Sequence, residues 1–213
     1  MASKKSIILF LAIFLLLASI AYAHQPRIVS DEFTQIINPE ISQAFYGNLH
    51  GKPHTFQIKS DTHFKLYAGV LVPDLPGIDK DVSAEAKSEN NTVFVLDGPN
   101  HNWTQFYEEF GGDNYYKGPE KEIEGNPGTY DITVSSPDNK GKYVLVVGKI
   151  ESFPLNEALN TLFVLPQLKK NFFNKSPLTA FFNLIGVFLL IMLLALIGII
   201  LLAIWIIRKA MKN

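Results

Sequence analysis

Residues 128–147 read GTYDITVSSPDNKGKYVLVV, and this stretch decides the fold. Apolar and polar side chains alternate over residues 130–134, and residues 143–147 form a second short apolar run. A period of two is typical of a half-buried β-strand. Residues 137–141, between the runs, contain the proline, aspartate, asparagine and glycine that favour a turn. The stretch therefore predicts two strands joined by a tight turn.

Similar short runs lie upstream, at residues 44–46, 55–58, 64–67, 70–72 and 93–96. Segments rich in Gly, Pro, Asn and Asp separate them. Many short strands with such turns indicate a sandwich or a jelly roll and not a βαβ fold. We therefore expect a mainly β protein, with a single β-sandwich or jelly-roll domain over residues 24–150.

The order of the strand motifs resembles a known family. The opening motif is Gly47-x-Leu49-x-Gly51-x-Pro53-x-x-Phe56, followed by Phe64-x-Leu66-Tyr67 and Leu71-Val72-Pro73. It looks like the first strands of bacterial pre-peptidase C-terminal (PPC-type) β-sandwiches, and residues 128–134 and 141–147 are similar to that family's G-x-Y-x-(L/V)-x-V ending. The resemblance covers residues 44–148. It implies an accessory module that binds or solubilises beside an enzyme, but no protease domain accompanies it here.

Two apolar segments predict export and membrane anchoring. Residues 1–23 combine Lys4 and Lys5, an apolar run and an Ala-Tyr-Ala ending, which is typical of a signal peptide cleaved before His24. Residues 178–207 contain no charged residue and are long enough for a transmembrane helix in the lipid bilayer. The basic tail, residues 208–213, is then cytoplasmic. We expect a protein of the plasma membrane, with its sandwich extracellular or periplasmic.

Charge and composition restrict the function of the middle region. All 20 Asp and Glu lie between Asp31 and Glu157, and the chain between the two apolar segments holds 14 Lys and Arg. An acidic surface argues against nucleic acid as a partner. The chain has no cysteine, which excludes disulfides and thiolate metal sites. About 150 residues outside the apolar ends suffice for one domain with its own core.

Residues 151–177 differ from the region before them. Leucines and phenylalanines recur near helical spacing, interrupted by Pro154 and Pro166. This pattern predicts an amphipathic juxtamembrane segment that lies on the bilayer, with Lys169, Lys170 and Lys175 near the headgroups. The alternative is a docking face for a partner in a larger membrane complex.

His24 is a candidate metal ligand. A mature N-terminal histidine offers its α-amine and its ring nitrogen to one metal ion, a chelate suited to Cu(II). Residues 23–30 are similar to the mature start of periplasmic copper-resistance protein C. That family completes its site with an Asp-x-His pair, whose spacing occurs here at Asp61 and His63, although much earlier in the chain. His50 and His54 are other possible partners.

A second candidate site lies in a segment rich in acids and aromatics. Residues 107–124 predict a long loop, on which carboxylates suit Ca²⁺ and aromatic rings suit a sugar or a peptide. The candidate residues for a cation or ligand are Trp103, Glu108, Glu109, Asp113, Tyr115 and Tyr116. A solvated loop whose tyrosines pack over the sandwich edge is the alternative. No D-x-D-x-D-G calcium loop is present.

Motifs for enzymatic chemistry are missing from the sequence. It contains no G-x-S-x-G, H-E-x-x-H, P-loop or Rossmann fingerprint. We therefore expect a non-catalytic, membrane-anchored protein whose sandwich binds a protein or glycan partner. The alternatives are a copper-binding protein that uses His24 and an accessory subunit of a membrane complex.

Overall fold

The two runs of residues 128–147 are strands, but they belong to different sheets. The computed structural model describes residues 24–152 and 154–211; the signal-peptide prediction, residues 1–23, lies outside them. β10 (Gly128–Ser135) pairs with β4 (His54–Ser60) and β6 (Ser83–Ser88). β11 (Lys140–Val147) pairs with β3 (Gln43–His50) and β5 (Phe64–Pro73). The turn at residues 136–139 therefore leads the chain from one sheet to the other.

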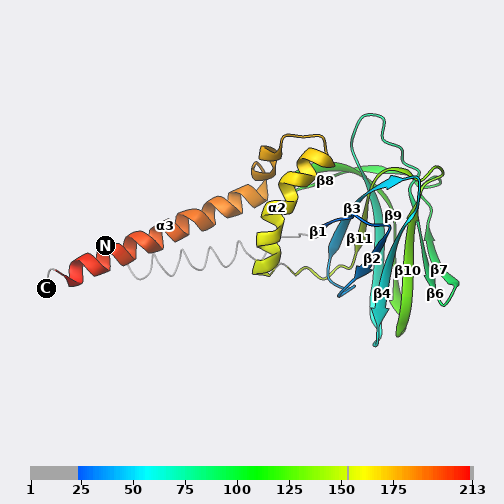
Figure 1. Ribbon diagram of the computed structural model, residues 1–213, viewed down its shortest axis with the longest axis horizontal. Helices are drawn as coiled ribbons and strands as arrows, with labels where there is room; N and C mark the ends of the chain where they lie inside the picture. Colours follow the sequence, from blue (N-terminus) through cyan, green and yellow to red (C-terminus); the bar gives the residue numbers. More distant parts are fainter. Residues whose placement is uncertain (1–23, 153, 212–213) are drawn as a thin grey trace.

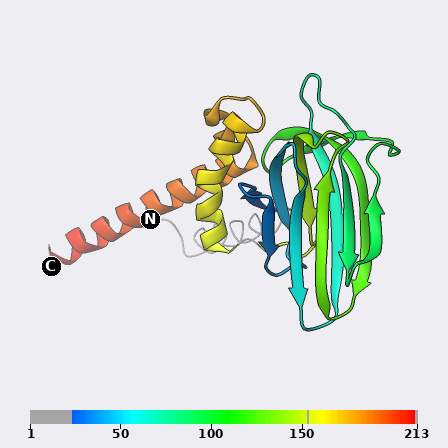
Figure 2. The same ribbon diagram turned by 45° about the vertical axis from the view of Figure 1, so that its right-hand side comes forward.

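Two sheets face each other and form a β-sandwich (Figures 1 and 2). Sheet A has the order β1-β3-β11-β5-β9-β8, and sheet B has the order β2-β4-β10-β6-β7. The remaining strands are β1 (Gln25–Ile28), β2 (Phe33–Ile36), β7 (Asn91–Leu96), β8 (Thr104–Glu108) and β9 (Asp113–Gly125). β1 and β2 are the edge strands on the same side, and each runs parallel to its neighbour. The mainly β prediction is confirmed.

The core lies between the sheets and consists of every second residue of the central strands. Phe56, Leu66, Ile132 and Leu145 are fully buried there. These residues come from both sheets, which explains why the alternation in the sequence predicted the strands so well. Residues 64–67 and 70–72, predicted as two strands, form the single strand β5, whose register with β9 shifts between Gly69 and Leu71.

A helix covers part of the outer face of sheet A. α2 (Leu155–Asn171) begins after Pro154 and continues through Pro166, so the expected break at Pro166 is wrong. Its last turns and the residues after it pack on the outward side chains of the sheet. The buried members of this outer cluster are Ala44, Tyr115, Val144, Val146, Leu168, Phe172 and Phe173. Sheet A is therefore apolar on both faces where α2 covers it.

The chain leaves the sandwich through a short 3₁₀ helix and a long α-helix. η1 (Pro177–Phe181) precedes α3 (Leu184–Ala210), and Asn183 caps α3 by accepting a hydrogen bond from the backbone N–H of Gly186 at 3.1 Å. α3 projects away from the sandwich in both views (Figures 1 and 2). Within the described part of the chain, no helix is found with the length and apolarity needed to cross a membrane.

Candidate functional site

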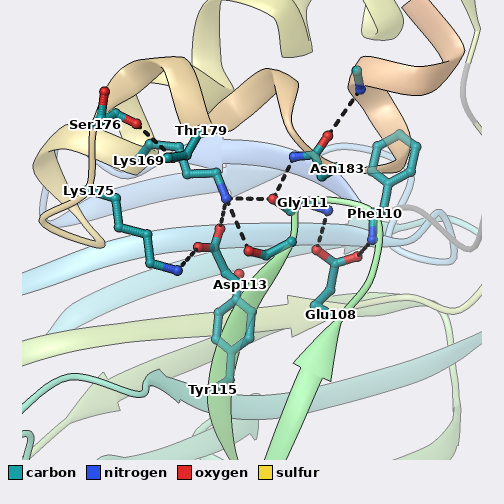
Figure 3. A network of polar contacts seen from close by, with 12 residues as sticks. Glu108, Phe110, Gly111, Asp113, Tyr115, Lys169, Lys175, Ser176, Thr179 and Asn183 are labelled. Atoms are coloured by element: carbon teal, nitrogen blue, oxygen red, sulfur yellow. Dashed lines mark hydrogen bonds and ion pairs between the residues drawn. The ribbon is translucent and has the colours of Figure 1, made fainter.

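A network of polar contacts lies where the β8–β9 turn meets the helices (Figure 3). We call it the junction and define it by Glu108, Gly111, Asp113, Lys169, Lys175 and Asn183. The turn is tight because Gly112 adopts a φ of 71° and donates its N–H to the carbonyl of Glu108 at 2.9 Å. The turn brings Glu108 and Asp113 to the end of sheet A that α2 covers.

Asp113 binds two lysines beneath α2. One carboxylate oxygen accepts from Lys169 Nζ at 2.6 Å, and the other accepts from Lys175 Nζ at 2.8 Å. The side chains of Asp113 and Lys169 are each 1% exposed. A charge removed from water to this extent is tolerated only when it is paired and hydrogen-bonded. Both charges of this buried pair therefore depend on the docking of α2.

Backbone carbonyls complete the binding of Lys169 and extend the network to α3. Lys169 Nζ donates to the carbonyl of Gly111 at 2.5 Å. The same carbonyl accepts from Asn183 Nδ2 at 2.7 Å. Asn183 is also the residue that caps α3. The carbonyl of Gly111 in the sandwich thus accepts hydrogen bonds from Lys169 of α2 and from Asn183, the N-cap residue of α3.

Glu108 stabilises the turn itself. Its two carboxylate oxygens accept the backbone N–H groups of Phe110 at 2.8 Å and of Gly111 at 2.7 Å. Burial raises the pKa of Glu108, and these two hydrogen bonds partly oppose the shift. Since all four carboxylate oxygens of Glu108 and Asp113 already accept hydrogen bonds, the chemistry that the junction supports is docking of the helices.

Aromatic rings surround the charged centre. The hydroxyl groups of Tyr115 and Tyr46 lie 3.1 Å apart, and burial raises the pKa of both phenols. Phe173 contacts the Tyr115 ring edge-to-face, with ring centroids 5.5 Å apart. These rings exclude water from the ion pair and strengthen it.

The predicted acidic loop is wrong as a loop, because residues 107–124 form the end of β8, a tight turn and β9. Of its candidate residues, Glu108, Asp113 and Tyr115 lie at or beside the junction, and the other three lie apart from it. Glu109 is exposed in the turn. Tyr116 points between the sheets, with Lys80 Nζ 4.0 Å from its ring centroid, and Trp103 donates to the carbonyl of Gly98 at 2.8 Å. Calcium, sugar or peptide binding by this set stays a prediction.

The predicted copper ligands do not come together. His24 lies before β1, where its Nδ1 contacts the hydroxyl of Ser42 and burial lowers its pKa. Asp61 and His63 are exposed in the turn between β4 and β5. β3 and β11 separate β1 from β5 in sheet A, a lateral distance of about 14 Å. The described residues contain no group of three or more potential ligands, so copper binding also stays a prediction.

The residues that complete the junction include one that the sequence pattern placed elsewhere. The prediction that Lys169 lies near the lipid headgroups is wrong, because its side chain is buried in the docked face of α2. One signal could have found it: Lys169 follows Leu165 by four residues, a spacing that places both side chains on one side of a helix. A lysine there needs a buried acid, and Asp113 supplies it.

The comparisons with known proteins found similarity among solved structures. No model of a protein family matches it, and no curated protein sequence matches it. Among solved structures, it is similar to the pre-peptidase C-terminal domain of collagenase from Bacillus anthracis, with 12% identity and a TM-score of 0.33 over 60% of this chain and 97% of that chain.

Two β-glucosidases are also similar in part. The enzyme from Kluyveromyces marxianus gives 18% identity and a TM-score of 0.27 over 54% of this chain and 12% of that chain. The enzyme from Paenibacillus barengoltzii gives 9% identity and a TM-score of 0.30 over 59% of this chain and 13% of that chain. Because all three TM-scores are low, these similarities support no conclusion about function.

Proposed function

We propose that this protein is a single-pass, membrane-anchored extracytoplasmic protein whose non-catalytic β-sandwich binds a partner in a fixed orientation to its anchor. The junction is the observation on which the proposal rests. Lys169 and Asn183, from α2 and from the cap of α3, both donate to the carbonyl of Gly111. A flexible tether would need no buried ion pair, whereas a sandwich held at a fixed angle does.

The amino-acid sequence supports the membrane anchor. Residues 178–207 carry no charge. α3 has 27 residues, and a helix of that length extends about 40 Å, more than the roughly 30 Å of a hydrocarbon core. Large apolar side chains along it are exposed, among them Leu194 and Ile199. Because no spanning helix is found among the described residues, the anchor is proposed from the uncharged sequence of residues 178–207.

The proposed binding surface is a groove at the edge of the sandwich that β1 and β2 form. It has a volume of about 540 Å³ and lies between the edge strands β1 and β2 and the start of α2. Arg27 lines it and pairs with Glu157 of α2 at 2.7 Å. Ile37 at its rim is 71% exposed. Its lining combines apolar side chains with polar groups that are held in place, as is typical of a surface that binds a partner.

Carbonate washing of membranes from cells that express the full chain tests the anchor. We expect the protein to stay in the pellet and its N-terminus to begin at His24. A matched control carries Ile197→Lys and Leu201→Lys in α3, which should release it into the supernatant because charges near a bilayer centre are costly. Release of the unaltered chain, or a mature product that begins at Met1, would contradict the proposal.

Site-specific photo-crosslinking tests the groove. A photoreactive phenylalanine analogue at Ile37 should give a discrete adduct in native membranes. The same analogue at Val95 is the control, because that side chain is 56% exposed on the opposite edge of sheet B. Equal adducts from both positions, or none from Ile37, would argue against a binding role for the groove.

A further inference from the structure

α2 has two apolar faces, and only one of them contacts the sandwich. Thr161, Leu165 and Leu168 are buried on the side of sheet A. Leu159 and Phe163, which lie about 180° around the helix from that stripe at 100° per residue, are 51% and 71% exposed. A surface helix of a soluble domain normally turns charged residues outward. We therefore expect the exposed apolar side chains on the outer face of α2 to contact something other than the sandwich.

η1 extends this exposed apolar surface. Leu178 is 67% exposed, Phe181 is 43% exposed, and Phe182, directly after η1, is 84% exposed. Both views show α2 and η1 on the side of the sandwich from which α3 leaves, with α2 running across the direction of α3 (Figures 1 and 2). We call Leu159, Phe163, Lys170, Leu178, Phe181 and Phe182 the α2–η1 surface. It adjoins the first turn of α3.

The charge around this surface has one sign. Residues 158–183 contain no Asp or Glu but three Lys, whereas all 20 acids of the chain precede them. Lys170 is exposed on the outer face of α2. Lys175 keeps 40% of its side chain exposed beside Asp113. A cationic, aromatic-rich surface complements the anionic headgroups of a bilayer.

We propose that the α2–η1 surface lies on an anionic lipid bilayer, with Phe163 and Phe182 inserted at the boundary between headgroups and acyl chains. This rests on the proposed membrane anchor, since α3 brings the surface to the bilayer. Because the opposite face of α2 is pinned to sheet A by the junction, contact with lipid fixes the tilt of the whole sandwich. The partner of this surface is thus lipid, and a protein that covers it is an outcome that the test below would reveal.

Single spin labels test the proposal cleanly, because the chain has no cysteine of its own. The full chain is labelled separately at Phe163→Cys, Phe182→Cys, Ile197→Cys and Val95→Cys, and is reconstituted in phosphatidylcholine vesicles with and without phosphatidylglycerol. Access to oxygen and to a water-soluble nickel chelate gives the depth of each label. Ile197 in α3 reports the anchor, and Val95 on the distal edge of sheet B reports water.

We expect labels at positions 163 and 182 to favour oxygen over nickel in vesicles with phosphatidylglycerol, and the label at position 95 to do the reverse. Without the anionic lipid, protection from nickel at position 163 should fall several-fold. Lys170→Glu should cause a similar fall in vesicles with phosphatidylglycerol, whereas the matched control Lys59→Glu on β4 should not.

The labels distinguish failure of the lipid contact from failure of the anchor. A lipid-exposed label at position 197 with either position 163 or position 182 open to nickel would overturn the lipid contact and leave the anchor intact. An aqueous label at position 197 would overturn the anchor itself. Labels at positions 163 and 182 that are shielded from both reagents would show that a second copy of the chain covers the surface, which would overturn the lipid contact. Equal protection in both kinds of vesicle would overturn the requirement for anionic lipid.

Discussion

Gly47 and Tyr143 share one space in the core, which explains the glycine in the opening motif. The two residues are register partners on β3 and β11. A Cβ atom at position 47 would lie 2.3 Å from the ring Cζ of Tyr143. The Tyr143 hydroxyl also pairs with Nδ1 of the buried His54 at 2.7 Å. A side chain at position 47 would displace the ring and disturb this hydrogen bond.

We therefore expect Gly47→Ala to lower the free energy of unfolding by about 1–3 kcal/mol, the usual cost of overpacking a core. Urea denaturation of the purified chain measures it. Asn48→Ala is the matched control, because Asn48 is the next residue of β3 and is half-buried. Equal stability of the Gly47→Ala variant and the control would contradict the close contact.

His54 predicts a dependence of stability on pH. Burial lowers its pKa from 6.5, and the carboxylate of Glu32 partly opposes this shift. The folded protein thus binds the proton less readily than the unfolded chain does. The stabilisation from neutral His54 is complete above pH 6.5 and is lost as the pH falls from 6.5 to the lower pKa of the folded state.

His54→Gln should remove this contribution. Between about pH 7.5 and about pH 5, we expect the free energy of unfolding to fall more steeply for the unaltered chain than for the variant. Urea titrations at several pH values give both curves. Parallel curves would exclude His54 as a source of the dependence.

The docking of α2 depends on a pair of charges, Asp113 at the start of β9 and Lys169 in α2. Lys169→Met leaves Asp113 buried with Lys175 as its remaining lysine partner. We expect a loss of about 1–3 kcal/mol in the free energy of unfolding, since the buried carboxylate loses one of its two lysine partners. Lys170→Met is the control, because its side chain is exposed and a surface substitution changes little.

A double-mutant cycle with Asp113→Asn isolates the pair. The double variant should lose less stability than the two single variants together, with a coupling energy of about 0.5–3 kcal/mol. Hydrogen exchange should show that the backbone of α2 is deprotected first. Additive losses would mean that the two side chains contribute independently of each other.

The strands that the sequence predicted place large apolar side chains in the core. All the predicted runs lie within β3, β4, β5, β7, β10 or β11. β9 was missed because its second half places Glu120, Glu122 and Glu124 on successive outward positions, with the equally exposed Lys121 between two of them. Charged residues on both sides hide the period of two on which a prediction of strands relies.

The junction could not be predicted from the sequence, for a different reason. Asp113 and Lys169 are 56 positions apart, and only the placement of β9 beside β5 in sheet A brings the acid beneath α2. The spacing of Leu165 and Lys169 indicates that they share one face of a helix, but it does not identify Asp113 as the partner. The basic and apolar composition of residues 151–177 was seen, but which lysine turns toward the sandwich depends on where the helix docks.

At the scale of the whole molecule, the acidic residues and the residues proposed to contact lipid lie in different parts of the chain. All 20 acids lie before residue 158, whereas the only charges in residues 158–213 are basic. The sandwich, α2 and the cap of α3 meet at the carbonyl of Gly111. In the proposed arrangement, the groove between β1 and β2 is held at a fixed position relative to the bilayer, where a partner can reach it.

Labelling with a membrane-impermeant maleimide in intact cells tests this arrangement most directly, because the chain has no cysteine of its own. Val95→Cys and Met211→Cys introduce one exposed thiol each, before and after the proposed span. The account predicts labelling of position 95 in intact cells, and labelling of position 211 only after the cells are permeabilised. Labelling of both positions in intact cells, or of position 211 alone, would contradict it.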